Sequence, residues 1–354
     1  MEPAQDLHVL EMVPLISPND LKREIPTTPT AAETVAEARI GVRNIFHRQD
    51  DRLLLIVGPC SIHDPVASIE YATKLAAYAH QMKDRILIVM RTYFEKPRTT
   101  FGWRGLINDP HLDGSYDMGE GLRLARKLLV DVNSMGLPTA VEMLDPVTPQ
   151  YIAELVCCTA IGARTTESQT HRALASGLSM PVGFKNATDG GLQVAIDAAI
   201  SARNRHSFLG IDLDGRSCVV KTTGNPDGTL ILRGGRNNTN YDVGSIMNAS
   251  EQLANAGLIS TVMVDCSHAN SGYDVQRQKA VWKAVVDERE QTSGALVGLM
   301  VESNLIEGKQ PLTSRLEDLK YGVSVTDAGI GWEHTEELLE YTYAKCASGA
   351  VSIR

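Results

Sequence analysis

The 354-residue chain lacks the features that mark several classes of protein. No apolar run approaches the roughly 18 residues that a transmembrane helix needs, and the acidic first residues contain no basic stretch typical of a signal peptide. Its six cysteines form no CxxC pair, so we expect reduced thiols and a cytoplasmic location. A net charge of −9 argues against nucleic acid or an anionic membrane as a partner.

Three common catalytic motifs are also missing. Without a GxxxxGK[ST] loop, nucleotide phosphates are poor candidates for a ligand. There is no GxSxG or HExxH motif to indicate a serine hydrolase or a zinc protease. Aromatic residues make up only 5% of the chain, which suits the packing of small side chains in α/β layers better than an aromatic-rich sandwich.

Short apolar runs alternate with helical stretches from residue 53 onward. The runs are continuous, as in strands buried on both faces of a parallel sheet. Their centres follow one another at roughly 35 residues, close to the 30 or more that one βα unit needs. We therefore predict a (β/α)8 TIM barrel, with an open doubly wound sheet as the alternative. The predicted strands are 53–58, 85–91, 139–144, 160–164, 182–185, 229–233, 261–265 and 296–302.

The first 50 residues carry no strand signal, so we predict an N-terminal extension at 1–50 and a barrel at 51–354. A helix is expected to begin at Thr30. The barrel is interrupted at about 207–228, where an Asp-Gly turn predicts an inserted β-hairpin. The adjacent pair Cys157 and Cys158 is expected inside a helix.

Cationic residues gather at the carboxyl ends of the predicted strands, the face that holds the active site in α/β barrels. Burying them would be costly unless they were paired or offered to a ligand. Such a concentration in an acidic chain indicates anions that carry more charge than one carboxylate, such as two phosphorylated substrates. The six positions are Arg91, Lys96, Arg98, Arg164, Lys185 and Arg233.

A second group at the same ends combines a thiol, an imidazole and two carboxylates, namely Cys60, His268, Glu302 and Asp327. Donors of this mixed softness suit Mn²⁺, Fe²⁺, Co²⁺ or Zn²⁺. A nucleophilic pair of Cys60 with His63 is the weaker alternative, because neighbouring side chains on a loop rarely face each other.

Several long motifs then match one family. The runs GPCSIHD (58–64), MRTYFEKPRTT (90–100), IGARTTESQTHR (161–172), VDCSHANS (264–271) and SVTDAGIGWE (324–333) resemble the type I-alpha 3-deoxy-D-arabino-heptulosonate-7-phosphate (DAHP) synthases. The resemblance covers nearly the whole chain. It implies the first step of the shikimate pathway, in which phosphoenolpyruvate and erythrose 4-phosphate condense with water to DAHP and phosphate.

The resemblance also implies roles for individual residues. The metal would be held by Cys60, His268, Glu302 and Asp327. Phosphoenolpyruvate would be bound by Arg91, Lys96, Ala163, Arg164, Lys185 and Arg233, and erythrose 4-phosphate by the run that contains Lys96, Arg98 and Thr99. Glu142 would orient a water near the enol carbon, and Lys96 is a candidate proton donor. The catalytic set is thus Lys96, Glu142, His268 and Asp327.

Relatives in this family are inhibited by an aromatic amino acid, which implies a separate effector site and a homodimer or homotetramer. The resemblance thus makes residues 1–50 a regulatory and oligomerisation extension and residues 51–354 the catalytic barrel. The implied effector residues are Pro149, Gln150, Leu178, Ser179 and Phe208. Runs such as EMLDP, GLSMPVG and LKYGVSVTD are more similar to the tyrosine-sensitive relatives, so we expect tyrosine as the inhibitor.

Two other functions are compatible with the same residues. The sister synthase makes an eight-carbon acid from arabinose 5-phosphate on the same barrel, although the Lys-Pro-Arg-Thr run and the extension favour the four-carbon sugar. A non-catalytic sensor would bind the amino acid without performing the reaction, but every metal and phosphate position is filled.

Overall fold

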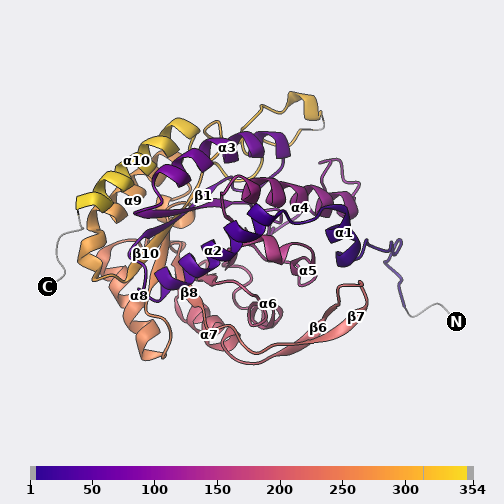
Figure 1. Cartoon of the computed structure of the whole chain (residues 1–354), viewed down its shortest axis with the longest axis horizontal. Coiled ribbons are helices and arrows are strands. Elements are labelled where there is room, and N and C mark those ends of the chain that lie inside the picture. The colour runs from indigo at the N-terminus through magenta and orange to yellow at the C-terminus, as the bar shows by residue number, and fades with distance from the viewer. Residues whose placement is uncertain (1–4, 314, 349–354) are drawn as a thin grey trace.

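The structure, a computed structural model, describes residues 5–313 and 315–348 and is built on a closed parallel barrel (Figure 1). The barrel order is β1-β10-β9-β8-β5-β4-β3-β2, which confirms the TIM barrel and excludes the open sheet. The residues of these strands are buried except Leu87 and Gly228, which are partly buried, as expected where helices cover a parallel sheet. The strands are β1 Leu53–Gly58, β2 Ile86–Arg91, β3 Thr139–Glu142, β4 Cys158–Ile161, β5 Val182–Lys185, β8 Gly228–Leu232, β9 Val262–Asp265 and β10 Leu296–Glu302.

Helices surround the barrel, and several begin with a proline at the first turn after a capping side chain. The α-helices are α1 Pro18–Glu24, α2 Pro29–Phe46, α3 Pro65–Gln81, α4 Met118–Ser134, α5 Pro149–Ile152, α6 Gln169–Ala175, α7 Gln193–Ala202, α8 Val243–Asn255, α9 Val275–Glu288 and α10 Trp332–Ser348. Short 3-10 helices are η1 Ala153–Leu155, η2 His268–Ser271, η3 Arg289–Thr292 and η4 Leu316–Asp318.

Some predicted boundaries were wrong. The fourth barrel strand ends at Ile161, so Arg164 lies in the turn after β4 rather than at the end of the strand. Helix α2 is capped by Thr28, whose hydroxyl accepts a hydrogen bond from the Ala31 amide at 3.1 Å, so the helix begins before Thr30. Arg233 follows β8 by one residue.

The expected helical position of Cys157 and Cys158 was also wrong. Cys158 begins β4, where it pairs with Ala140 of β3, and both cysteines are buried. Small apolar side chains fit a helix and a strand equally well, so pairing with the neighbouring strands decides the local structure.

Helix α2 closes the amino-terminal end of the barrel. Val42, Ile45 and Phe46 on this helix are buried. The Phe46 carbonyl accepts a hydrogen bond from the hydroxyl of Thr261, the residue before β9, at 2.8 Å. The Phe46 ring borders a narrow apolar cavity inside the barrel together with Tyr93 of the segment after β2. Part of the residue range 1–50 therefore belongs to the hydrophobic core.

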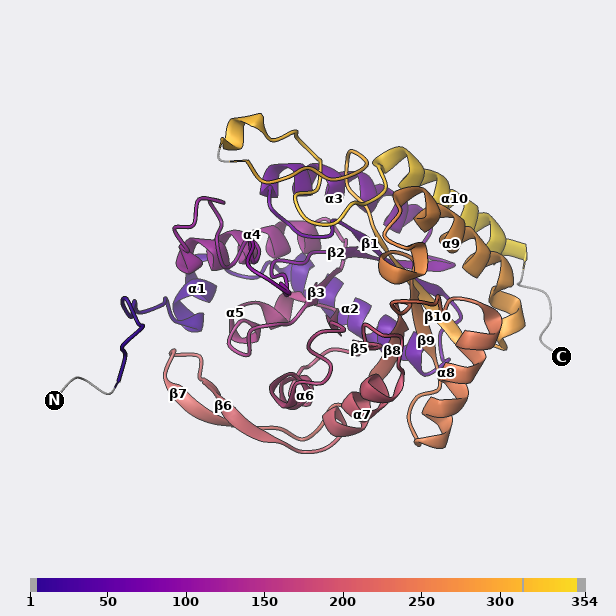
Figure 2. The same cartoon turned by 180° about the vertical axis from the view of Figure 1, so that it is seen from behind.

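Strands β6 (Ser207–Ile211) and β7 (Ser217–Lys221) form the expected antiparallel hairpin outside the barrel (Figure 2). Its tip contacts α1: the Asn19 side-chain amide donates to Asp214 at 2.8 Å, and the Asn19 amide donates to the Leu213 carbonyl at 2.8 Å. The hairpin therefore connects the N-terminal segment to the side of the barrel.

Candidate active site

Buried ionisable residues end several barrel strands. A parallel barrel brings all its carboxyl ends to one face, and β1 and β10 are in register there, with Gly58 opposite Glu302. The strand-end residues on this face are 7% exposed or less, and they are Arg91, Glu142, Lys185, Asp265 and Glu302. So many buried charges on one face require partners or ligands.

Three of these strand ends, Arg91, Glu142 and Lys185, line one cavity of about 240 Å³. Its wall contains every residue predicted to bind a substrate and every residue predicted to be catalytic. They are Arg91, Lys96, Arg98, Thr99, Glu142, Ala163, Arg164, Lys185, Arg233, His268 and Asp327. The cavity therefore combines six cationic side chains with the acids Glu142 and Asp327 and the imidazole of His268.

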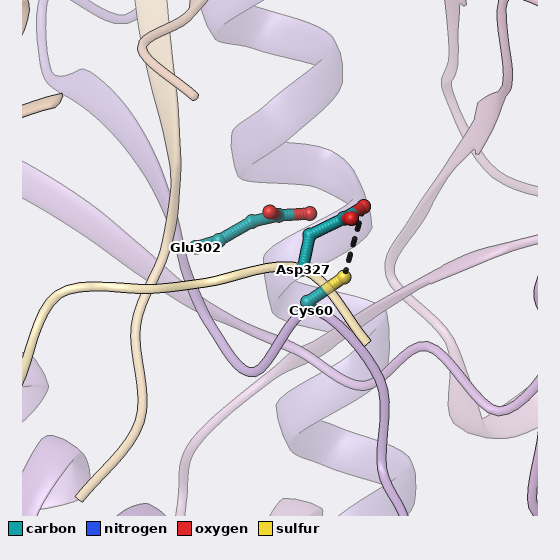
Figure 3. Close-up of side chains that lie close together, drawn as sticks. All are labelled: Cys60, Glu302 and Asp327. Atoms are coloured by element: carbon teal, nitrogen blue, oxygen red, sulfur yellow. Dashed lines mark hydrogen bonds between the residues drawn. The ribbon is translucent and has the colours of Figure 1, made fainter. Parts of the chain in front are cut away.

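Three of the predicted metal ligands point toward one another in Figure 3. The ligand atoms of Cys60, Glu302 and Asp327 all lie within 4.8 Å of one another, and the Cys60 Sγ atom is 3.8 Å from Asp327 Oδ2. The fourth, His268, lies beside this cluster, with Nε2 at 3.7 Å from Glu302 Oε1. A thiol, two carboxylates and an imidazole fit a divalent metal of borderline softness.

Cationic neighbours keep Glu302 ionised. Burial opposes ionisation, but the charges of His268, Arg91 and Lys96 together hold the pKa of Glu302 below its ordinary value. The Arg91 guanidinium lies 2.9 Å from Glu302 Oε1. A deprotonated carboxylate is the form that a metal ion needs.

The Lys96 ammonium contacts the thiol of Cys60 from the cavity side. Its Nζ atom lies 3.0 Å from Cys60 Sγ and 3.1 Å from the Cys60 carbonyl oxygen. Burial opposes this positive charge, yet Cys60 and Glu302 raise the pKa of Lys96. Burial and the charge of Glu302 raise the pKa of the Cys60 thiol, so metal binding would have to displace a proton from this sulfur.

Asp265 ends β9, and the sequence suggested no role for it. Its Oδ2 atom lies 2.7 Å from Lys185 Nζ and 2.9 Å from His268 Nδ1. Burial alone would raise the pKa of this carboxyl, but His268 and Lys185 hold it well below its ordinary value. The only sequence signal was an acidic residue that ends an apolar strand.

Two further contacts join residues on different loops of the cavity. The Arg164 guanidinium donates to the Thr99 hydroxyl at 3.0 Å, which links a residue predicted for phosphoenolpyruvate to one predicted for the sugar phosphate. The Arg233 guanidinium donates to the Tyr273 hydroxyl at 2.9 Å. Sequence reasoning missed Tyr273, because an exposed tyrosine on a loop carries no distinctive signal.

The predicted effector residues lie on elements outside the cavity. Pro149 and Gln150 begin α5, Leu178 and Ser179 precede β5 at its amino end, and Phe208 lies in β6. The Tyr151 hydroxyl of α5 donates to the Ile16 carbonyl at 2.7 Å, so α5 contacts the N-terminal segment directly.

A parallel barrel with this ring of cations and metal-type donors is the arrangement of a metal-dependent enzyme that acts on phosphorylated substrates. Residues 25–340 match the DAHP synthetase I family, and the chain belongs to that family.

Among the helices of the described residues, none has the length and apolar character that a membrane span needs.

Two curated relatives come from Escherichia coli (strain K12). The chain is 53% identical over 334 residues to the Phe-sensitive phospho-2-dehydro-3-deoxyheptonate aldolase, covering 94% of this chain and 95% of that protein. It is 49% identical to the Tyr-sensitive enzyme, covering 94% of each chain. The solved phospho-2-dehydro-3-deoxyheptonate aldolase of Francisella tularensis SCHU S4 superposes with a TM-score of 0.92 at 47% identity, covering 96% of this chain and 98% of that one.

Proposed function

We propose that this enzyme condenses phosphoenolpyruvate with D-erythrose 4-phosphate and water to give DAHP and inorganic phosphate, the first step of the shikimate pathway. Membership of the family supports this reaction. The observation that carries it is the single cavity in which six cationic side chains surround acids and an imidazole. Two phosphates and one carboxylate are the anions that such a cavity suits.

In the reaction, a bond forms between C3 of phosphoenolpyruvate and the aldehyde carbon, water adds to C2, and phosphate leaves by cleavage of its bond to C2. The guanidinium of Arg164 and the ammonium of Lys185 bind the phosphoenolpyruvate anion, with the Ala163–Arg164 backbone beside it. Arg98 and Thr99 bind the second phosphate. These contacts bring two anions together and orient them, which lowers the entropic cost of the reaction.

Glu142 acts on the attacking water, and Lys96 acts on the new alkoxide. Glu142 orients the water that adds to C2. Lys96, whose pKa is raised by Cys60 and Glu302 despite its burial, carries a proton that the new alkoxide can accept. A divalent ion such as Mn²⁺, Fe²⁺, Co²⁺ or Zn²⁺, held by Cys60, His268, Glu302 and Asp327, would supply Lewis acidity at the aldehyde oxygen.

Phosphate release measured with each sugar phosphate tests this proposal. Metal-stripped protein is supplied with Mn²⁺, phosphoenolpyruvate and either erythrose 4-phosphate or arabinose 5-phosphate. We expect release with the four-carbon sugar. Release with arabinose 5-phosphate alone would assign the chain to the eight-carbon synthases. Binding of an aromatic amino acid without any phosphate release would indicate a sensor.

Regulation and assembly are part of the same proposal, for a cytoplasmic homodimer or homotetramer inhibited by tyrosine. Support comes from the N-terminal segment, where Leu10 is 98% and Met12 and Val13 are each 73% exposed. Apolar side chains this exposed suit a contact with a second copy. That contact would bring the segment of one copy against the effector residues Pro149, Gln150, Leu178, Ser179 and Phe208 of another. The relatives include Phe-sensitive and Tyr-sensitive enzymes. Titration with each aromatic amino acid therefore decides which one inhibits this enzyme.

The test removes residues 1–13 and leaves α1 intact, because Leu21 and the inner face of α2 are buried. The truncated enzyme should lose inhibition and part of its assembly while it keeps its catalytic cavity. Full-length and truncated proteins are titrated separately with Phe, Tyr and Trp and sized by sedimentation. Undiminished inhibition after truncation would exclude the segment from the effector site, and a preference for phenylalanine would exclude tyrosine.

A further inference from the structure

The buried carboxylate of Asp265 connects the proposed metal site to the proposed substrate site. Asp265 ends β9 and is 0% exposed. Its Oδ1 atom accepts a hydrogen bond from the Ser267 amide at 3.0 Å. Its Oδ2 atom faces both Lys185 Nζ, at 2.7 Å, and His268 Nδ1, at 2.9 Å. One oxygen therefore contacts a group proposed for phosphoenolpyruvate and a group proposed for the metal.

The contact with His268 determines which ring nitrogen is free. Oδ2 lies 2.9 Å from Nδ1 but makes no hydrogen bond with it, so the contact acts through charge. A carboxylate so close would repel a lone pair on Nδ1, which favours a proton there. Nε2, the nitrogen 3.7 Å from Glu302 Oε1, is then the one whose lone pair a metal ion would bind. Carboxylates are common partners of the second ring nitrogen of metal-binding histidines.

The backbone around His268 is held in an unusual conformation that supports this orientation. His268 has φ of 55°, which is uncommon outside glycine. Its carbonyl accepts hydrogen bonds from the Tyr273 amide at 2.8 Å and the Ser271 hydroxyl at 3.1 Å. The Glu302 amide donates to the Ser267 hydroxyl at 2.9 Å, which joins this turn to β10. The turn therefore presents the imidazole to the cluster of acids, with Asp265 behind it.

The contact with Lys185 serves the other site. Lys185 ends β5, is 4% exposed and lines the cavity. A buried ammonium needs a compensating charge while no anionic substrate is bound. Asp265 supplies that charge and holds Nζ at the cavity wall.

We propose that Asp265 is a positioning residue that sets the metal-binding nitrogen of His268 and the location of the Lys185 ammonium together. The inference rests on the proposed function for the identity of the substrate and the metal. Its consequence is that one neutral substitution at position 265 weakens both metal binding and phosphoenolpyruvate binding, while the sugar phosphate site is spared.

The test compares Asp265→Asn with the wild type and with Asp242→Asn. Asp242 is an exposed capping residue of α8 whose Oδ1 accepts from the Ser245 amide at 2.9 Å, and asparagine caps a helix equally well. We expect Asp265→Asn to weaken Mn²⁺ or Co²⁺ binding by about 10- to 100-fold and to alter the visible spectrum of the Co²⁺ protein, both measured without substrates. At saturating metal, the KM for phosphoenolpyruvate should rise and the KM for erythrose 4-phosphate should stay unchanged.

A second variant, Lys185→Met, separates positioning from general damage. It removes one partner of Asp265 and keeps the other, so phosphoenolpyruvate binding should weaken while the metal affinity and the Co²⁺ spectrum are retained. Circular dichroism and thermal unfolding establish that each variant is folded.

Three outcomes would overturn the proposal. They are an unchanged metal affinity and Co²⁺ spectrum in folded Asp265→Asn, an equal loss in Asp242→Asn, and loss of metal binding in Lys185→Met. Because metal binding is measured without turnover, a wild type that fails to release phosphate would refute the proposed reaction and leave this result standing.

Discussion

Gly162, which follows β4, leaves the space that the carboxylate of Glu142 occupies at the end of β3. A Cβ atom at position 162 would overlap Glu142 Oε1 and lie 3.1 Å from Glu142 Cδ. Such an overlap is relieved only if the end of the Glu142 side chain moves away. The absence of a side chain at one position therefore determines where a proposed catalytic acid lies.

We predict that Gly162→Ala displaces Glu142 and lowers kcat sharply, at a stability cost of about 1–3 kcal/mol. The matched control is Gly119→Ala on α4, where the nearest atom to the new Cβ is Asp117 Oδ1 at 3.5 Å. That control should retain activity and gain slightly in stability, because alanine favours a helix. Steady-state kinetics and thermal unfolding of both variants check this prediction, and normal kcat in Gly162→Ala would contradict it.

Replacing the thiol of Cys60 should remove most activity while the fold survives, since a hydroxyl is a much poorer ligand than a thiolate for a borderline metal. EDTA should inactivate the wild type, and Mn²⁺, Co²⁺ or Zn²⁺ should each restore some turnover. Metal content is measured for Cys60→Ser and for the control Cys218→Ser in β7. Full activity in rigorously metal-stripped wild type would contradict the predicted metal dependence.

Removing the Arg164 guanidinium should raise the KM for phosphoenolpyruvate and lower kcat. Charge-assisted hydrogen bonds contribute about 1.5–3 kcal/mol each, which is roughly a 10- to 150-fold loss in kcat/KM. Because Arg164 also donates to Thr99, Thr99→Val is measured alongside it to isolate that link. If Arg164→Ala changes only the KM for erythrose 4-phosphate, the substrate assignment is wrong.

Glu95 gives the chain a pH-dependent stability that a glutamine would lack. Its side chain is buried, with Oε1 lacking a hydrogen-bond partner. Burial, and then the charge of Asp145, raise the pKa of Glu95 from 4.5 to about 8, against smaller opposing effects of hydrogen bonds with the Asp145 backbone and Thr148 and of the charge of Arg104. The folded state therefore keeps a proton that the unfolded chain has released.

Stability should consequently fall as the pH rises from about 4.5 to about 8 and then level off, since the unfolded chain binds fewer protons in that window. Glu95→Gln should remove this decline, so that the variant unfolds at a higher temperature than the wild type above pH 8 and at a similar one near pH 4.5. The exposed Glu33→Gln is the control. Parallel unfolding curves of Glu95→Gln and wild type across this range would show that the carboxyl is not buried as described.

The barrel could be predicted from the chain because a strand buried on both faces has to be apolar throughout. The runs at 53–58, 182–185 and 296–302 coincide with β1, β5 and β10. Prediction failed where the residues were ambiguous. Cys157 and Cys158 fit a helix or a strand, and pairing with β3 places Cys158 in β4, with Cys157 directly before it.

By itself, the sequence determined which polar groups end the strands, since covalent order places Arg91, Lys185 and Glu302 directly after apolar runs. Only the tertiary structure decided which of these groups touch. The contacts of Asp265 with Lys185, of Gly162 with Glu142 and of Phe46 with the inside of the barrel join segments that are distant in the chain. Such contacts depend on strand order, stagger and side-chain packing, and these are established only when the barrel closes.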